Sequence, residues 1–263
     1  HYACYPNIFS FLGGRPVYLN LRGDEGFRYR IEEVEGLISP RTKAILINSP
    51  ANPTGIVMDR EDLERLAQCE PCFVISDEIY HGLVYEGRAH SILEFTDRAF
   101  VLNGFSKVYG MTGWRLGYTI VPEEFIRPMQ RVQQNFFISA NAFVQWAGVA
   151  ALKESQRTIV EHVKEYDARR RFIIKRLKEI GFGIGAEPTG AFYVLADAHR
   201  FGSDSHRLSF ELLEKAGVAV TPGIDFGSKG EGFLRFSYSN SSENIAEGMN
   251  RLDRYLNGKA PQS

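Results

Sequence analysis

The first half of the chain alternates short apolar runs with stretches whose apolar residues recur at helical spacing. The runs at 44–47, 73–75 and 100–102 are apolar throughout, which is typical of strands buried on both faces of a parallel sheet. The stretch 59–68 has one apolar face and begins with an aspartate suited to cap a helix. Strands that alternate with helices predict βαβ units, and hence an α/β fold with a mostly parallel sheet flanked by helices.

Two further runs, at 16–21 and 116–121, are also predicted to be strands. After about residue 123, long helical patterns replace the alternation. The elements predicted there are helices over 125–131, 141–153, 154–180, 205–216 and 243–257, and strands over 191–195, 218–221 and 233–238. We therefore expect a large α/β domain over residues 1–153 and a smaller α+β domain over residues 154–263, which includes the long connecting helix.

The composition of the chain limits the partners, the cellular location and the metals that can be expected. The chain has 31 basic and 32 acidic residues, and its net charge of -1 argues against nucleic acid or a membrane surface as a partner. No apolar run approaches the ~20 residues of a membrane-spanning helix. The three cysteines are too few for a disulfide framework, which favours a reducing, cytoplasmic location. Cys69 and Cys72 form a C-x-x-C pair, but no second ligand pair accompanies it and the six histidines have no metal-site spacing, so no metal is expected.

Polar side chains follow each of the three buried runs. Asn52 comes after the first run, Asp77 and Tyr80 after the second, and Lys107 after the third. Because ligands of an open α/β sheet bind outside the carboxyl ends of its strands, these residues are expected at one edge. An amine, a carboxylate and a phenol together suit a cofactor that carries an aldehyde on a pyridine ring. Arg115 and a hydroxyl next to the lysine suit a phosphate.

Three motifs give these residues a family context. The stretch Gly104-Phe105-Ser106-Lys107-Val108-Tyr109-Gly110-Met111-Thr112-Gly113-Trp114-Arg115-Leu116-Gly117 resembles the pyridoxal-phosphate attachment signature of class I aminotransferases. Asn52-Pro53-Thr54-Gly55 and Asp77-Glu78-Ile79-Tyr80 resemble two more hallmarks of the class I/II aminotransferase family, in the right order. The resemblance implies the fold of type I pyridoxal-phosphate enzymes, with a large cofactor-binding domain and a smaller C-terminal domain.

The resemblance also implies which residues hold the cofactor ring. Lys107 would form the Schiff base with pyridoxal 5'-phosphate and then move the substrate Cα proton. Asp77 would pair with the pyridinium nitrogen. Asn52 and Tyr80 would hydrogen-bond the ring oxygen O3′. Lys107, Asp77 and Tyr80 are thus the residues expected to be catalytic.

The remaining roles concern the phosphate, the ring face and the substrate. By the same resemblance, Ser106 and Arg115 would hold the phosphate, and Tyr2 would stack on the ring. Arg235 would grip the substrate α-carboxylate, with Asn52 also counted among the substrate-binding residues. An arginine fork suits this role because it binds a carboxylate through two parallel hydrogen bonds.

The chain departs from the family pattern in two ways. Many relatives carry a serine three residues before the lysine, where this chain has Gly104. The resemblance also begins part-way into the family, so it covers only about the C-terminal two-thirds, and the large domain is expected to be incomplete at its N-terminus. We interpret the chain as N-terminally truncated, and the resemblance implies a homodimer for the full-length protein.

The function expected from these features is transamination, in which an L-amino acid passes its amino group to a 2-oxo acid. Three alternatives stay open at this stage. One is another reaction of the same cofactor, such as C–S β-elimination or cyclopropane formation. Another is a non-catalytic, aminotransferase-like sensor module of a regulator. The third is an inactive fragment of an active parent enzyme.

Overall fold

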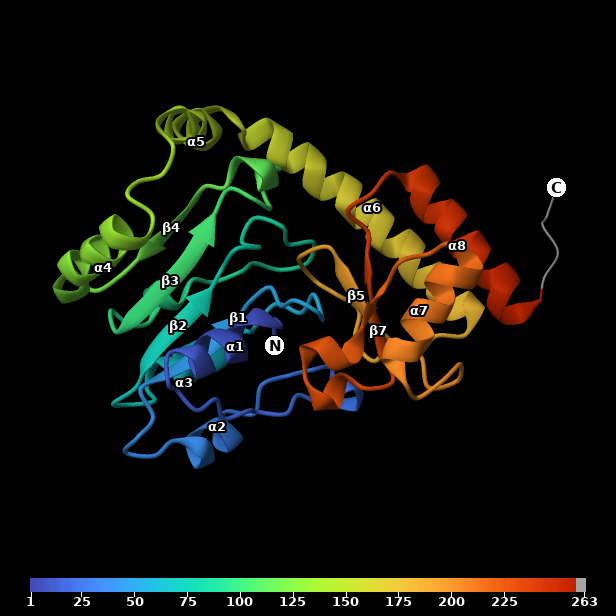
Figure 1. Ribbon diagram of the computed structural model, residues 1–263, viewed down its shortest axis with the longest axis horizontal. Coiled ribbons are helices and arrows are strands. Elements are labelled where there is room, and N and C mark those ends of the chain that lie inside the picture. The colour runs from blue at the N-terminus through green and yellow to red at the C-terminus, as the bar shows by residue number, and fades with distance from the viewer. Residues whose placement is uncertain (259–263) are drawn as a thin grey trace. The chain divides into compact units, whose positions relative to one another are not determined.

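The computed structural model describes residues 1–258 of the chain and divides into two compact units (Figure 1). Unit 1 comprises His1–Arg28, Ala51–Ile56 and the chain from Lys164 onward. Unit 2 comprises Tyr29–Pro50 and Val57–Val163. Each unit has its own sheet and its own buried side chains, and each is described by itself.

Unit 2 is built on a four-stranded sheet. Its strands are β1 (Ala44–Asn48), β2 (Phe73–Asp77), β3 (Ala99–Gly104) and β4 (Gly117–Ile120), in the order β1-β2-β3-β4. The first three run parallel, and β4 is antiparallel to β3. The side chains of Ile47, Val74 and Val101 are almost fully buried, as continuous apolar runs predict for the middle of such a sheet. The predicted α/β fold with a mostly parallel sheet is confirmed.

Unit 2 has several helices, and α4 packs on the sheet through an aromatic cluster. The helices of this unit are α2 (Ile31–Leu37), α3 (Arg60–Ala67), α4 (Glu123–Phe136), α5 (Ala142–Glu154) and the first turns of α6 (Gln156–Ile180). Phe125 of α4 lies edge-on to Phe100 and Phe73, with ring centroids 5.0 and 5.4 Å away. Asp59 precedes α3 in an extended conformation, although its side chain makes no cap hydrogen bond.

Unit 1 is an α+β assembly around a three-stranded antiparallel sheet. Its strands are β5 (Tyr193–Asp197), β6 (Thr221–Pro222) and β7 (Phe233–Ser237), in the order β5-β7-β6. Its helices are α1 (Cys4–Phe11), the C-terminal part of α6, α7 (Ser205–Ala216) and α8 (Ser242–Asn257). The core is formed by fully buried residues of these elements, among them Leu177, Val194, Leu212, Leu234 and Leu252.

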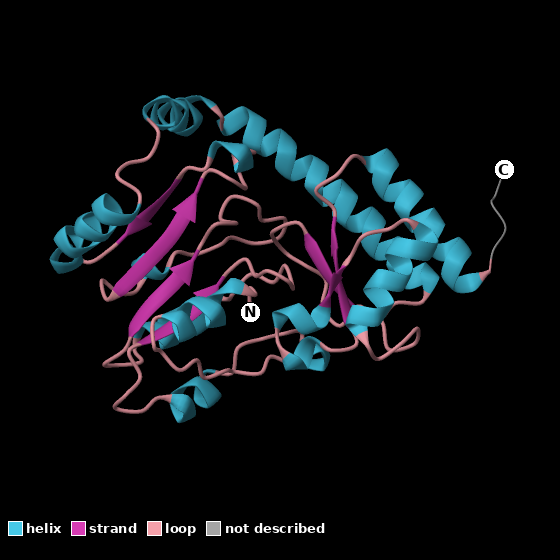
Figure 2. Cartoon of the chain, in the orientation of Figure 1, coloured by secondary structure: helices cyan, strands magenta, loops and turns pink. Residues whose placement is uncertain are grey.

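Two predicted strands differ from the structure. Residues 16–21 form no strand, and Figure 2 draws none between α1 and α2. Their alternating pattern has no neighbouring strand to pair with, and Val17 and Tyr18 remain 64% and 50% exposed. The strand predicted over 218–221 is reduced to Thr221–Pro222, because only these two residues pair with β7.

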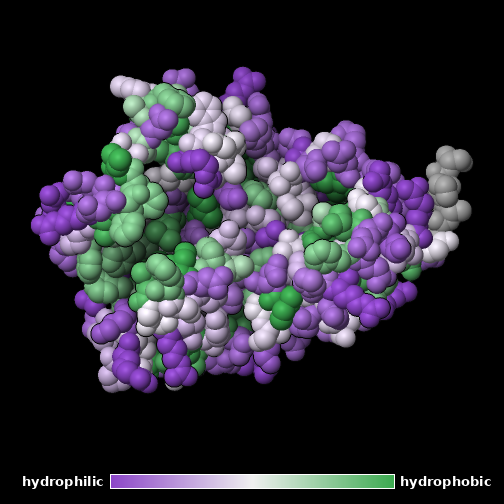
Figure 3. Space-filling view, viewed as in Figure 1, coloured by the Kyte–Doolittle hydropathy of each residue, from purple (hydrophilic) through white to green (hydrophobic). Residues whose placement is uncertain are grey.

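Large apolar side chains remain exposed on unit 2. Figure 3 shows hydrophobic residues (green) gathered on the side of this face where strands β2 to β4 lie. The exposed set from β4, α4, the loop after α4 and the start of α5 includes Tyr118, Ile120, Val132, Phe136, Phe137, Ile138, Phe143 and Trp146. Among residues 1–258, no helix combines the length and the apolar character needed to cross a membrane.

Candidate active site

The carboxyl ends of β1, β2 and β3 meet at one edge of the unit 2 sheet. Asn48 is paired with Asp77 across β1 and β2, and Asp77 is paired with Leu102 across β2 and β3. The Asn48 side-chain amide donates a hydrogen bond to the Asp77 carbonyl at 2.9 Å, and the Glu78 amide donates to the Leu102 carbonyl at 2.9 Å. This parallel register brings Asp77 to the edge from which the chain leads to Lys107.

Asp77, Tyr80 and Lys107 are positioned by short-range contacts around this edge. The Asp77 carboxylate accepts a hydrogen bond from the Ile79 amide at 3.1 Å, which turns the chain sharply after β2. The Tyr80 side chain is buried, and the Lys107 Nζ lies 5.7 Å from the centre of its ring. An amine and a phenol ring that leave different strands are therefore neighbours.

The segment between β3 and β4 folds back on itself. Phe105 donates its amide to the Leu116 carbonyl and accepts from the Met111 amide, both at 3.1 Å. The Thr112 hydroxyl donates to the Ser106 carbonyl at 2.7 Å. Gly110 adopts a left-handed conformation with φ 64°, as a tight turn in this segment requires. Ser106 and Lys107 are held in a closed loop rather than on a free surface strand.

Arg115 ends this loop in an unusual backbone conformation. Its φ of 56° is left-handed, which is uncommon for a residue with a Cβ. Its Nη1 donates to the Thr112 carbonyl at 2.9 Å, and the side chain is exposed. Arg115 also lines a hollow of about 910 Å³ together with Gly110, Gly113 and Trp114. A guanidinium beside glycine backbone is a suitable environment for an anion.

Arg235 is the centre of the polar cluster in unit 1. Its guanidinium carbon lies 4.4 Å from the centre of the Tyr193 ring and 5.0 Å from that of Phe226. The Nη1 donates to Asn52 Oδ1 and the Nη2 donates to Thr221 Oγ1, each at 2.9 Å. The Nε is buried without a hydrogen-bond partner in the described chain. No carboxylate within residues 1–258 pairs with this cation.

Comparison with known proteins identifies the family. The family model described as aminotransferase class I and II matches residues 1–252. The chain belongs to this family. A (5-formylfuran-3-yl)methyl phosphate transaminase of Methanocaldococcus jannaschii is 45% identical over 260 residues, which are 97% of this chain and 67% of that protein. An aspartate aminotransferase of Pyrococcus abyssi is 36% identical over 267 residues, 98% of this chain and 68% of its own.

Solved structures agree with this assignment. The Thermus thermophilus aspartate aminotransferase with maleate superimposes with a TM-score of 0.92 at 39% identity, covering 97% of this chain and 67% of that one. The expected family, the class I/II aminotransferases, is confirmed. The expected activity class, a transferase that moves amino groups, is confirmed with it.

The glycine that replaces the usual serine of this aminotransferase signature is explained by packing. A Cβ at Gly104 would lie 3.0 Å from both the Gly117 Cα and the Leu116 carbonyl oxygen. Gly104 and Gly117 are directly paired across β3 and β4, so the two strands approach closely where neither has a side chain. A serine here would require one of the two strands to shift.

The structure brings together some of the predicted site residues. In unit 2, Tyr80 and Lys107 are neighbours; in unit 1, Asn52 contacts Arg235. Tyr2, in unit 1, is 43% exposed, and its ring lies edge-on to that of Tyr5 with the centroids 5.5 Å apart. No described contact joins Tyr2 to Arg235. The assigned roles of all these residues stay predictions.

Sequence reasoning missed three residues around Arg235, namely Thr221, Tyr193 and Phe226. Tyr193 lies on β5 two residues before Leu195, which is paired with Arg235, and so shares a face of the sheet with it. Thr221 is opposite Arg235 on β6. Strand alternation would have found these neighbours only if the register had been known.

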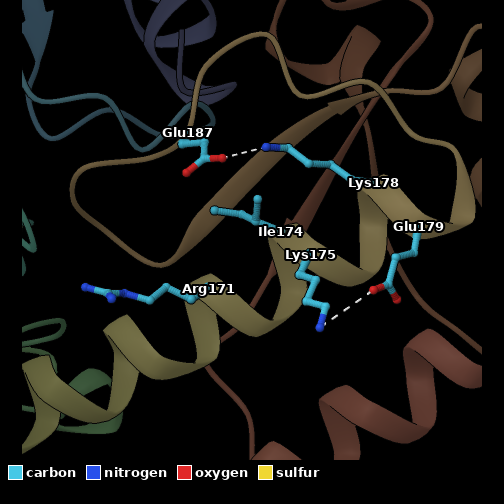
Figure 4. Close-up of a pocket in the computed structure, with 6 residues that line it drawn as sticks. All are labelled: Arg171, Ile174, Lys175, Lys178, Glu179 and Glu187. Carbon is cyan, nitrogen blue, oxygen red and sulfur yellow. Dashed lines mark hydrogen bonds and ion pairs between the residues drawn. The ribbon is translucent and has the colours of Figure 1, made fainter.

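The hollow drawn in Figure 4 has a different character. It has a volume of about 360 Å³ and is lined by Arg171, Ile174, Lys175, Lys178, Glu179 and Glu187. Lys178 pairs with Glu187 at 2.6 Å, and Lys175 lies 3.9 Å from Glu179. These half-exposed pairs neutralise one another, and none of the predicted site residues lines the hollow.

Glu78, next to Asp77, is the buried anchor of the turn after β2. One carboxylate oxygen accepts hydrogen bonds from Ser76 Oγ, Ser91 Oγ and the Ile92 amide at 3.0–3.1 Å. The other oxygen lies 3.3 Å from His81 Nδ1. Burial lowers the pKa of His81 below its ordinary value of 6.5, and the nearby Glu78 carboxylate opposes this shift only in part.

The His81 pKa predicts a pH dependence of stability. Well above pH 6.5, His81 is neutral in both the folded and the unfolded chain. As the pH falls below 6.5, the unfolded chain binds this proton first, so the free energy of unfolding should decrease. We expect His81→Gln to flatten this part of the curve, measured by urea unfolding between pH 7.5 and 5 at ~0.5 intervals. The exposed His162, changed to Gln, is the control, and equal slopes for both variants would contradict the prediction.

Gly55 predicts a second, larger effect on stability. Its φ is 71°, and an added Cβ would lie 2.4 Å from Pro188 Cβ and 2.9 Å from the carbonyl oxygens of Gly190 and Tyr193. We expect Gly55→Ala to lower the free energy of unfolding by about 3 kcal/mol, since both backbone strain and overpacking act. Gly248→Ala, in the open interior of α8, should instead be neutral or stabilising by about 0.5 kcal/mol. Denaturant unfolding of both variants tests this, and similar values for the two would refute it.

Proposed function

We propose that this chain carries the site of a pyridoxal-phosphate-dependent aminotransferase, which moves an amino group from an L-amino acid to a 2-oxo acid. The observation that carries the proposal is the Lys107 amine beside the Tyr80 ring, in the loop after a strand adjacent to the one that ends at Asp77. This combination offers a nucleophilic amine, a phenol and a carboxylate from one edge of a parallel sheet, where ligands of such sheets bind.

The donor set of unit 2 fits this cofactor. The Lys107 amine matches the aldehyde, the Asp77 carboxylate matches the protonated pyridine nitrogen, and the Tyr80 hydroxyl matches the ring oxygen. Arg115, exposed beside Gly110 and lining the hollow of about 910 Å³, matches a phosphate, with Ser106 as a second donor. Pyridoxal phosphate, when bound, supplies an aldehyde that captures amines and a ring that accepts electrons from the substrate Cα.

The residues of the chain would supply proton transfer and orientation. Lys107 would take the proton from the substrate Cα as a general base and then deliver it, as a general acid, to the carbon that was the cofactor's aldehyde carbon. Asp77 would hold the proton on the pyridine nitrogen, which requires its carboxylate to stay ionised. Tyr80 is buried, so its hydroxyl would be held in one orientation beside the lysine. Tyr2 is proposed to cover the ring face and Asn52 to contact the ring oxygen.

Arg235 is proposed to hold the α-carboxylate of the substrate. A half-buried guanidinium that lies against two aromatic rings, with no carboxylate partner in the described chain, is electrostatically prepared for an anion. Of its five N–H donors, Asn52 and Thr221 take one each. One donor remains on each terminal nitrogen, which is the number that bidentate binding of a carboxylate needs.

Four further features complete the proposal, namely the assembly, the location, the domains and the substrates. The exposed apolar side chains on β4, α4 and α5 support a homodimer, because a patch of this kind is usually covered by another protein surface. Sedimentation of the purified protein tests this. We further propose a cytoplasmic enzyme, with its large cofactor domain over residues 1–153 and its small domain over residues 154–263. Its substrates would be amino acids and 2-oxo acids, as the names of the transaminase relatives suggest.

Chemical trapping tests the central claim. The purified protein is incubated with pyridoxal phosphate, reduced with borohydride, digested and analysed by mass spectrometry. We expect the pyridoxyl group on the peptide that contains Lys107, and a visible absorbance band that borohydride removes. Labelling of other lysines in place of Lys107, or of none, would overturn the proposal.

A further inference from the structure

Thr221 is tied to Arg235 by the register of the unit 1 sheet. The two residues are directly opposite in the antiparallel pairing of β6 and β7, which places their side chains on the same face. The Thr221 hydroxyl accepts a hydrogen bond from Arg235 Nη2 at 2.9 Å. This contact joins residues 14 positions apart in the chain and fixes one end of the guanidinium.

The other contacts of Arg235 leave one degree of freedom that Thr221 removes. The rings of buried Tyr193 and Phe226 lie 4.4 and 5.0 Å from the guanidinium carbon, so stacking on them restrains its tilt. Stacking does not restrain rotation within the guanidinium plane. Hydrogen bonds at two separate points do, and Asn52 at Nη1 and Thr221 at Nη2 are those points.

We propose that Thr221 is a positioning residue for the substrate carboxylate, which acts by fixing the in-plane orientation of the Arg235 fork. This inference rests on the proposed function, since it takes Arg235 as the carboxylate site. With Thr221 bound, each terminal nitrogen keeps one N–H for the two carboxylate oxygens. Without the hydroxyl, the fork samples several orientations, and binding must order it.

The valine and serine variants separate the hydroxyl from the shape of the side chain. Thr221→Val keeps the β-branched shape that suits a strand and removes only the acceptor. Thr221→Ser keeps the acceptor and removes the methyl group. The probes are propionate, which carries a carboxylate, and propionamide, which has a similar shape but no charge. Ligand-observed NMR titration of the cofactor-loaded protein gives their affinities without reference to turnover.

We expect Thr221→Val to weaken propionate binding by up to about tenfold, because binding must then order the Arg235 side chain. Propionamide binding should be unchanged. Thr221→Ser should restore propionate affinity to within about twofold of the wild type, because the hydroxyl is back. In turnover, Thr221→Val should raise the KM for the amino acid and leave kcat nearly unchanged, as expected for loss of binding made equally in ground and transition states.

Two outcomes would overturn the role of Thr221. One is unchanged propionate affinity in Thr221→Val and in Thr221→Ala, a second hydroxyl-free variant that covers the case in which valine does not fold. The other is an equal loss for propionate and propionamide, which indicates general damage. Arg235→Gln separates this inference from the proposed function. If Arg235→Gln binds propionate normally, Arg235 is not the carboxylate site and the proposed function fails at this point. If Arg235→Gln loses propionate binding while the Thr221 variants bind normally, the carboxylate site stands and only the positioning role of Thr221 fails.

Discussion

Lys107→Ala is expected to lower the rate of amino transfer by on the order of 10⁴-fold or more, because it removes both the nucleophilic amine and the general base. The Tyr80 ring, 5.7 Å from the amine, offers a phenol but no group that forms a bond to an aldehyde. The measurement is the rate at which a 2-oxo acid becomes an amino acid, with a panel of amino donors and saturating pyridoxal phosphate.

A matched substitution controls for loss of a lysine as such. Lys153 lies exposed in the last turn of α5, also in unit 2, and Lys153→Ala should retain the full rate. Thermal unfolding of both variants should match the wild type closely. A Lys107→Ala protein that keeps a tenth or more of the wild-type rate would show that the amine at position 107 does not carry the reaction.

Arg235→Gln is expected to reduce kcat/KM for amino acids by on the order of 100-fold or more. Removing one partner of a desolvated charge pair costs about 2–5 kcal/mol, and glutamine can neither neutralise a carboxylate nor bind it with a charged fork. The kcat/KM of Arg235→Lys should lie between those of the wild type and Arg235→Gln, since lysine restores the charge without the planar pair of donors. Initial rates over a range of amino-acid concentrations measure all three proteins.

The control for this series is Arg251 in unit 1. It pairs with Glu247 at 2.7 Å on the exposed surface of α8, and such surface pairs contribute little. Arg251→Gln should therefore leave kcat/KM unchanged. Equal losses in the Arg235 and Arg251 variants, or a normal rate in Arg235→Gln, would contradict a carboxylate-binding role for Arg235.

Much of the fold follows from local patterns. Continuous apolar runs predicted β1, β2 and β3, because a strand buried on both faces has no polar face to alternate with. Helix α7 lies at its predicted bounds, Ser205–Ala216, since it has a capping aspartate, Asp204, and a left-handed terminal glycine, Gly217. Residues 16–21 failed as a strand because a strand exists only where another lies beside it, and a local pattern cannot show that.

For the candidate site too, the sequence predicted some features and only the structure revealed others. The sequence by itself determined the family and the identities of Lys107, Asp77, Asn52 and Arg235 as the residues to examine, because the chemistry needs these side chains in recognisable motifs. Only the tertiary structure decided that Thr221, Tyr193 and Phe226 contact Arg235 and that Gly104 packs against Gly117. The physical reason is that strand register and close packing join residues far apart in the chain, and neither leaves a local pattern in the order of the amino acids.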